Sequence, residues 1–366
     1  MKRAPIRHPG CILLDADSIQ SQAKSAVAGA VGSPVPHDSS RLHVSGRATY
    51  TDDIPEPRDL LHVAVGVSGK PHARIRSIDL AAVVAAPGVV AVMTADEIPG
   101  ANNYGPVVDD DTFIAPGLVL YSGQAIFSVA AETVDQARRA ALLAEIQYDE
   151  LEPILDIRQA VAEESFVLPS EKIECGDSAQ AIANAQHRLK GSVELGGQDQ
   201  FYLEGQVALA IPAEDGDLTV YSSTQHPGEV QHLIAASTGI ASKDVVVECR
   251  RMGGAFGGKE SQAALIACIA ALMTQKTGRS CKLRLDRDAD MIMTGKRHDF
   301  VIDYEVGFDD RGRIEGVEFM FASRCGMSAD LSGAINDRTM FHCDNAYYLE
   351  NATIISHRCK THTVSN

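Results

Sequence analysis

Short apolar runs alternate with turn residues and with segments of helical periodicity across residues 41–150. Runs of this length that are rich in β-branched residues are typical of strands, and a three-to-four-residue apolar repeat is typical of a helix. The expected elements are strands over 60–67 and 89–93, extended pairs over 118–131, and helices over 79–85 and 133–144. This order predicts a compact α/β domain.

A second pattern, later in the chain, places a glycine-rich loop between a strand and a helix. The run from Asp244 to Cys249 is short and β-branched, which predicts a buried strand. Apolar residues recur at three- and four-residue steps from Ser261 to Thr277, which predicts a helix that Gly278 ends. The loop between the two elements, Met252–Glu260, contains four glycines.

The rest of the second half mixes strands and helices. A strand from Leu218 to Tyr221 runs towards a helix that Pro227 opens at its first position. Two alternating segments, 299–308 and 313–321, flank turn residues in the manner of a β-hairpin. We therefore expect an α+β protein in which the second domain is mixed α/β.

Changes in pattern along the chain suggest four parts. The first is poor in long apolar repeats, and the third is interrupted by Pro153 and Pro169. The expected parts are a tail or linker over 1–40, the α/β domain over 41–150, a connector over 151–170, and a second domain over 171–366.

Composition fits a chain with two packed cores. Its 366 residues are 45% hydrophobic, and neither a membrane span nor a secretory signal is expected from its apolar runs. The formal net charge of −16 argues against a nucleic-acid surface, because phosphate backbones require clustered Lys and Arg.

The cysteines are scattered, with no C-x-x-C pair. This spacing encodes neither a zinc site nor a ferredoxin-type cluster, and it favours a reducing cytoplasm over a disulfide framework. The eight cysteines are Cys11, Cys175, Cys249, Cys268, Cys281, Cys325, Cys343 and Cys359.

The glycine loop directs free backbone amides and a helix N-terminus at whatever lies over it, which suits an anion or a polarised oxygen. Gly253 to Lys259 satisfies the G-x-x-x-x-G-K part of a phosphate-binding loop. The next residue is Glu260, where a nucleotide site requires Ser or Thr, so ATP and GTP are disfavoured. The alternative is a tight turn whose glycines only allow close packing.

Two other sets of polar residues could suggest metal sites, but their spacing does not support one. The acidic run Val108–Asp111 lacks the spacing of a calcium loop, and we expect a solvated loop there. His226 and His298 have no neighbouring ligand residues at metal-binding spacing, so we do not expect either to bind a metal.

Several segments together resemble the molybdenum-binding portion of the xanthine dehydrogenase and aldehyde oxidase family. Their order along the chain is more specific than any one of them. The segments are Gly46–Pro55, Gly196–Glu204, Ser223–Gln225, Arg251–Glu260, Asp286–Arg287 and Thr294–His298. The resemblance implies a hammerhead domain over 41–150, followed over 171–366 by the first, incomplete part of a molybdopterin-binding domain.

The resemblance also implies roles for four residues. Gln225 matches the glutamine that hydrogen-bonds an oxygen ligand of molybdenum, and Phe256 with Gly257 matches the loop whose backbone reaches the metal's ligands. Gln225 and Phe256 would thus meet molybdenum only through its ligands. Glu260 matches the glutamate that orients the purine, where aldehyde oxidases usually carry an apolar residue. Independently of the resemblance, Glu260 could be a first-turn acid that satisfies the helix dipole.

In this family, molybdenum-bound hydroxide attacks an electron-poor ring carbon, and water supplies the inserted oxygen. The implied reaction converts hypoxanthine and xanthine to urate. The electrons then pass through [2Fe–2S] clusters and FAD, expected on a partner subunit, to NAD. The resemblance further suggests a dimer of heterodimers.

The family pattern continues beyond Asn366 into a substrate arginine and a distal catalytic glutamate, neither of which is in this sequence. We therefore assign no catalytic residue within it and expect the 366-residue chain to be inactive by itself. Two alternatives stay open. One is a molybdenum hydroxylase for an aldehyde or an N-heterocycle, and the other is a non-catalytic remnant that docks an iron–sulfur/FAD partner.

Overall fold

The computed structural model describes residues 31–366, and the chain divides into two compact units, Met1–Ala48 and Thr49–Asn366. Within the described part of the first unit there is one short helix, α2 (Ser40–Val44). Most of the predicted tail over 1–40, including Cys11, lies outside the described residues.

The second unit is built from strands, α-helices and short 3-10 helices, and none of the helices among residues 31–366 is long and apolar enough to cross a membrane. The strands are β1 (Leu61–Val67), β2 (Ala73–Asp79), β3 (Val89–Thr94), β4 (Leu118–Val119), β5 (Ala125–Ala131), β6 (Glu145–Glu150), β7 (Phe166–Cys175), β8 (His187–Leu195), β9 (Val207–Pro212), β10 (Leu218–Ser222), β11 (Val245–Glu248), β12 (Cys281–Arg284), β13 (Phe300–Phe308), β14 (Ile314–Gly326) and β15 (Ala352–Lys360). The helices are η1 (Thr51–Asp53), α3 (Ala81–Val84), η2 (Ala95–Glu97), α4 (Val134–Ala141), α5 (Ile157–Ala162), α6 (Ser178–Asn184), η3 (Glu214–Gly216), α7 (Pro227–Thr238), η4 (Ser242–Asp244), α8 (Ala263–Thr277), α9 (Arg287–Met293) and α10 (Ser332–His342).

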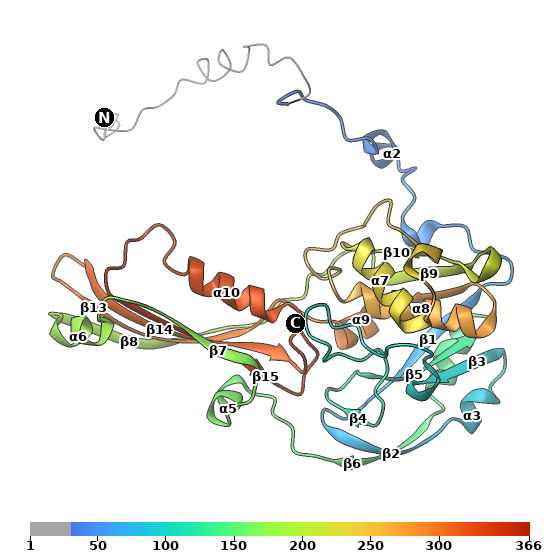
Figure 1. The fold of residues 1–366 in the computed structure, drawn as a ribbon, viewed down its shortest axis with the longest axis horizontal. Helices are drawn as coiled ribbons and strands as arrows, with labels where there is room; N and C mark the ends of the chain where they lie inside the picture. The colour runs from blue at the N-terminus through green and yellow to red at the C-terminus, as the bar shows by residue number, and fades with distance from the viewer. Residues whose placement is uncertain (1–30) are drawn as a thin grey trace, which may run out of the picture. The chain divides into compact units, whose positions relative to one another are not determined.

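The largest sheet of the second unit has seven strands in the order β11-β10-β9-β12-β1-β5-β3. Figure 1 labels β10, β9, β1, β5 and β3 of this sheet. Strand β1 pairs parallel with β12 and antiparallel with β5, so the two domains expected from the sequence share one sheet. The extended pairs expected over 118–131 are not a pair: β4 joins β2 in a separate three-stranded sheet, whereas β5 joins β1 and β3.

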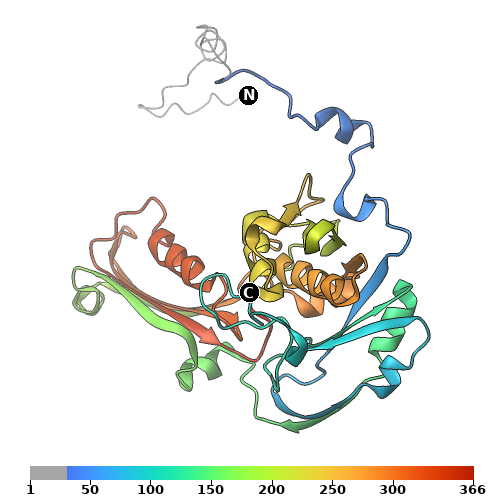
Figure 2. The same ribbon diagram turned by 45° about the vertical axis from the view of Figure 1, so that its right-hand side comes forward.

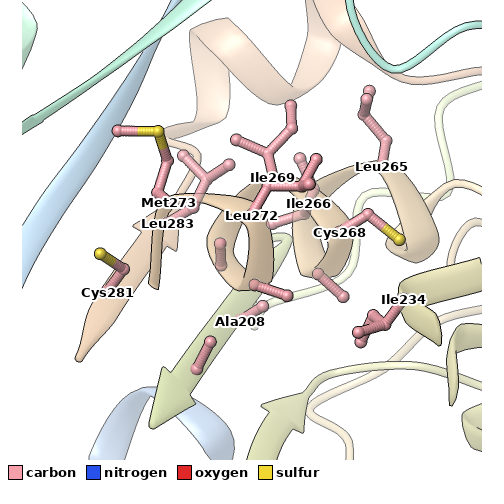
Figure 3. Packing of buried hydrophobic residues seen from close by; sticks show 14 of the residues in the cluster. Ala208, Ile234, Leu265, Ile266, Cys268, Ile269, Leu272, Met273, Cys281 and Leu283 are labelled. Carbon is pink, nitrogen blue, oxygen red and sulfur yellow. The ribbon is translucent and has the colours of Figure 1, made fainter. Parts of the chain in front are cut away.

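Helix α8 forms the centre of the main core. Its residues from Ala263 to Thr274 are all buried, and many are alanines, which lets the helix approach its neighbours closely. Figure 3 shows Leu272 and Ile269 of this helix among side chains from α7, β9 and β12. The helix that the sequence predicts over 261–277 is confirmed, with its start two residues later.

Gly278 ends α8 in the left-handed conformation, with φ of 66°, and its N–H donates to Thr274 O. A Cβ at this position would have open space, so only backbone strain opposes a side chain. We expect Gly278→Ala to lower the free energy of unfolding by about 1 kcal/mol, and Gly278→Asn by less. Urea denaturation measures both. As a control, Gly228→Ala places a methyl group in equally open space in the first turn of α7, where φ is not positive, and should not destabilise the protein.

A five-stranded sheet in the order β7-β15-β14-β13-β8 contains the hairpin that the sequence predicts over 299–321, formed by β13 and β14. Helix α10 packs against β15, and Figure 2 shows it, in red, lying along this sheet. The sheet core includes Phe321, Met340 and Ile354.

Regular structure extends into the segment predicted as an irregular connector, 151–170. It contains α5, and strand β7 begins inside it and runs through Pro169. Pro169 is compatible with the strand because β7 is at the edge of the sheet, where one side of the backbone needs no ladder hydrogen bond.

Candidate functional site

The glycine loop between β11 and α8 has an unusual backbone. Gly254, Phe256 and Gly257 have positive φ angles of 99°, 57° and 93°. Phe256 is the non-glycine residue of the three, and its side chain is 77% exposed. Positive φ at a bulky residue costs energy and is concentrated at functional sites, which supports the sequence-based choice of this loop.

Gln225 is tied to this loop by hydrogen bonds at both its backbone and its side chain. Its N–H donates to Lys259 O at 2.9 Å, and its Oε1 accepts from the N–H of Gly257 at 3.0 Å and of Lys259 at 3.4 Å. Because the side-chain oxygen faces two donors, Nε2 is the end of the carboxamide that is available to donate to a ligand. The structure thus brings Gln225 to the Phe256–Gly257 backbone, which lies more than thirty positions further along the chain.

Lys259 points away from solvent and is fully buried. Its Nζ donates to Glu204 O at 2.7 Å and to Ser223 Oγ at 2.6 Å, and it lies 3.5 Å from Glu204 Oε2. The same ammonium group sits 4.6 Å from the centre of the Tyr202 ring. This lysine is therefore not directed at a phosphate over the loop, a second reason to reject a nucleotide site.

Glu204 holds the other side of the loop. Its Oε2 accepts from Gly253 N at 2.8 Å and from Ser223 Oγ at 2.6 Å, and its Oε1 accepts from Thr51 N at 3.1 Å. A Cβ on Gly253 would be 2.5 Å from the Cβ of Glu204, so the close approach requires glycine. Lys259, Glu204 and Ser223 occur in the motifs noted in the sequence, but their shared buried site was not predicted.

A pocket of about 460 Å³ adjoins the loop. Its lining comes from Phe256–Gly258, from Glu260–Gln262, from Gly295–His298 and from the start of α10, with apolar surface from Leu195 and Phe300. Glu260 is exposed and lines this pocket. Glu260 is not a first-turn acid of α8, because the helix is N-capped by Gln262 and has no acidic residue in its first turn.

The acidic run 108–111 is solvated only in part, which corrects the expectation of a solvated loop. Asp111 is 2% exposed and accepts from Ser328 Oγ at 2.7 Å, while Asp110 accepts from Ala329 N at 2.8 Å. These bonds draw the run onto the turn before α10, which also carries Asp330. Burial raises the pKa of Asp111 to about 8 and that of Asp330 to about 6.

The two histidines considered in the sequence have protein partners. His226 Nδ1 lies 2.7 Å from Glu229 Oε2, and the buried His298 shares a hydrogen bond of 2.8 Å with Ser332 Oγ. Burial lowers the pKa of His298 to about 4. Among residues 31–366, no group of three or more His, Cys, Asp or Glu side chains is placed to hold a metal ion. The seven cysteines in that range form no disulfide.

Comparison with known proteins identifies two family matches. Residues 45–152 match the aldehyde oxidase and xanthine dehydrogenase a/b hammerhead domain, and residues 160–366 match the molybdopterin cofactor-binding domain. Xanthine dehydrogenase/oxidase of Gallus gallus is 39% identical over 337 residues, covering 92% of this chain and 25% of the relative. Aldehyde oxidase 2 of Cavia porcellus is 38% identical over 338 residues, with the same coverage.

Solved structures share the fold at lower identity. Aldehyde oxidoreductase from Desulfovibrio gigas superposes with a TM-score of 0.84 at 23% identity, covering 90% of this chain and 38% of that one. CO dehydrogenase from Oligotropha carboxidovorans gives a TM-score of 0.78 at 21% identity, covering 91% and 44%.

The fold, the glycine loop and these matches define a hammerhead domain joined to a molybdopterin cofactor-binding domain. The chain belongs to the xanthine dehydrogenase and aldehyde oxidase family of molybdenum hydroxylases, as the sequence motifs predicted. It spans about a quarter of the length of the curated relatives that it matches.

Proposed function

We propose that this chain forms part of the molybdenum-cofactor subunit of a purine hydroxylase of the xanthine dehydrogenase type, which oxidises hypoxanthine and xanthine to urate with water as the oxygen source. The observation that carries the proposal is an ionisable Glu260 in a largely apolar pocket, beside the loop that Gln225 binds.

The residues around the loop suit a molybdenum–molybdopterin cofactor. The carboxamide of Gln225 presents Nε2 as a donor, and a Cβ on Gly257 would meet open space, so the backbone there is accessible to a ligand. Phe256 N–H belongs to a left-handed turn, which suits contact with an oxygen atom, whereas Gly257 N–H already donates to Gln225 Oε1. Once bound, the cofactor would supply the hydroxylation chemistry, and Gln225, Phe256 and Gly257 would orient its oxygen ligands.

Glu260 favours a purine over an apolar aldehyde. A purine offers ring nitrogens and carbonyl oxygens that can pair with a carboxyl group, whereas an aldehyde with an apolar body would leave that group buried without a partner. The second candidate is an aldehyde-oxidising hydroxylase. It is supported by the 38% identity to aldehyde oxidase 2, which is nearly the value for the xanthine enzyme of Gallus gallus.

The remaining parts of the proposal follow from the family. We expect [2Fe–2S] clusters and FAD on a partner subunit, NAD as the final acceptor, a dimer of heterodimers, and a cytoplasmic location. The domain boundaries at 41–150 and 171–366 belong to the same proposal, supported by family matches over 45–152 and 160–366.

Glu260→Ala in the assembled holoenzyme should reduce kcat/KM for xanthine by about a hundredfold or more, and kcat/KM for an aromatic aldehyde by less than about tenfold. Steady-state kinetics with both substrates measures the split. Glu163→Ala changes an exposed glutamate on the turn after α5 and should alter neither value. Equal losses of kcat/KM on the two substrates would contradict the orienting role of Glu260. Absence of xanthine turnover in the wild-type holoenzyme would refute the proposed function.

A further inference from the structure

We propose that Lys259 is a positioning residue whose buried ammonium group locks the glycine loop, 252–260, onto the segment 223–225 and so holds the amides that face the cofactor. Only the link to the cofactor rests on the proposed function. The locking itself is a property of the described chain.

The first line of argument is the set of contacts at Nζ. The ammonium group has three acceptors of different origin: the backbone oxygen of Glu204, the hydroxyl of Ser223, and the Glu204 carboxylate. The face of the Tyr202 ring provides a further favourable contact for a cation. These groups come from the 202–204 segment, which precedes β9, and from Ser223, which follows β10, so the side chain joins these two parts of the chain beneath the loop.

The backbone of Lys259 makes the second connection. Its N–H donates to Gln225 Oε1 at 3.4 Å, and its carbonyl accepts from Gln225 N at 2.9 Å and from Thr224 Oγ1 at 3.3 Å. A single residue therefore binds the 223–225 segment through both its main chain and its side chain. Displacement of Lys259 would move the acceptor and the donor that orient Gln225.

A second set of buried groups supports the neighbouring residue. Gln206 Nε2 donates to Gly258 O at 2.8 Å and to the Tyr202 hydroxyl at 3.1 Å. Tyr202 in turn donates to Asp290 Oδ1 at 2.8 Å. A Cβ on Gly258 would lie 2.8 Å from the Tyr202 ring, so the loop lies directly on this network. Tyr202 is therefore shared by the contacts under Lys259 and those under Gly258.

The cost of burying Lys259 favours a role in fixing the position of the loop over a role in stabilising the fold. A lysine with no exposed surface loses its hydration, and the pairing with Glu204 offsets that cost only while every contact is in place. Burial lowers the pKa of Lys259, and the Glu204 carboxylate opposes that shift. An apolar side chain could fill the same space without this cost, but it would not connect Glu204 and Ser223.

Hydrogen–deuterium exchange on the full 366-residue chain tests the proposal without the cofactor. In Lys259→Met, we expect exchange of the amides in 253–259 to accelerate at least about tenfold, because Gly257 and Lys259 lose their fixed acceptor on Gln225. Arg358→Met is the matched control, because it also removes a buried cation. The partners of Arg358 are Pro169 O and Glu171 on β7 and Asp337 on α10, none of which belongs to the loop or to the 223–225 segment. It should change loop exchange by less than about twofold.

Loop exchange in Lys259→Met that is no faster than in Arg358→Met would overturn the proposal. Should Lys259→Met fail to fold, Ser223→Ala provides the same test with a smaller change, since it removes one Nζ acceptor and one donor to Glu204. We expect it to accelerate loop exchange about threefold or more. Unchanged loop exchange in Ser223→Ala would also overturn the proposal.

Molybdenum content of the assembled holoenzyme adds a second readout. We expect Lys259→Met to retain less than about half of the wild-type metal per chain and Arg358→Met to retain the wild-type amount. A wild-type holoenzyme without molybdopterin would refute the proposed function, while loop exchange would still decide the role of Lys259.

Discussion

Glu204→Gln should lower the free energy of unfolding by about 3–5 kcal/mol, because it leaves Lys259 buried without its counter-charge. The amide Nε2 is also a donor, and it would face either Gly253 N and Ser223 Oγ or, with the amide turned over, Thr51 N. One of these donors would then face another donor inside the protein. Urea denaturation at neutral pH measures the loss.

Two further variants separate the buried charge from other effects. The double variant Glu204→Gln with Lys259→Met should be more stable than Glu204→Gln alone, since the unpaired ammonium group is gone. Glu305→Gln loses only a pair with Lys190, in which the lysine is 78% and the glutamate 32% exposed, and should change stability by less than about 0.5 kcal/mol. A loss below about 1 kcal/mol for Glu204→Gln would mean that the pair contributes little to folding.

The elements that the sequence predicts correctly are those specified by neighbouring residues. The strand, glycine loop and helix over 244–278 follow from β-branched residues, glycines and an apolar repeat, and Gly278 ends the helix where a left-handed residue is needed. The hairpin of β13 and β14 follows equally from alternation around a turn.

Contacts between distant segments were not predictable in the same way. The pairing of β1 with β12 joins residues more than two hundred positions apart, and no local signal marks it. For this reason the sheet shared by the two expected domains was not predicted from the sequence. The burial of Lys259 is similar, because its acceptors on Glu204 and Ser223 lie 55 and 36 positions away.

The candidate site depends both on sequence motifs and on contacts between distant segments. Gln225, Phe256, Gly257 and Glu260 were selected by resemblance to family motifs. In the structure, a hydrogen bond joins Gln225 to Gly257, the neighbour of Phe256. Glu260 lines the adjoining pocket. The roles of these four residues towards a cofactor or a purine stay proposals. The buried contacts of Lys259 beneath the loop were not predicted from the sequence and were found in the structure.

Asp111→Asn should remove a pH dependence of stability that the wild-type protein shows between about pH 4 and pH 8. Burial raises the pKa of Asp111 to about 8, with Asp330 and Asp110 adding to the shift and hydrogen bonds from Ser328 and Tyr104 opposing it. At neutral pH, the folded protein therefore keeps a proton on Asp111 that the unfolded chain has released.

The proton retained on Asp111 determines the direction in which stability changes with pH. The stabilising contribution of Asp111 is complete below the pKa of the unfolded chain, near 3.8, and is lost as the pH rises towards 8. The loss is about 1.4 kcal/mol per pH unit for one proton. Asn is neutral at every pH, and its oxygen can accept from Ser328 as the carboxyl group does. The variant should therefore gain stability relative to the wild type as the pH rises, by about 2 kcal/mol or more at pH 8.

The difference between the variant and the wild type is the informative quantity, because other groups also titrate in this range. Asp330, with a pKa of about 6, reduces stability as the pH rises, whereas His298 and His362, each with a pKa of about 4, act in the opposite direction. The contributions of the two histidines cancel in the difference, and that of Asp330 cancels only in part, because Asp330 and Asp111 interact. Asp135→Asn removes an exposed carboxylate on α4 that pairs only with Arg139, so its difference from the wild type should stay constant within about 0.3 kcal/mol from pH 5 to pH 8. Parallel stability curves for Asp111→Asn and the wild type would show that Asp111 is ionised in the folded protein, and a buried anion beside Asp330 would then require a partner for its second oxygen.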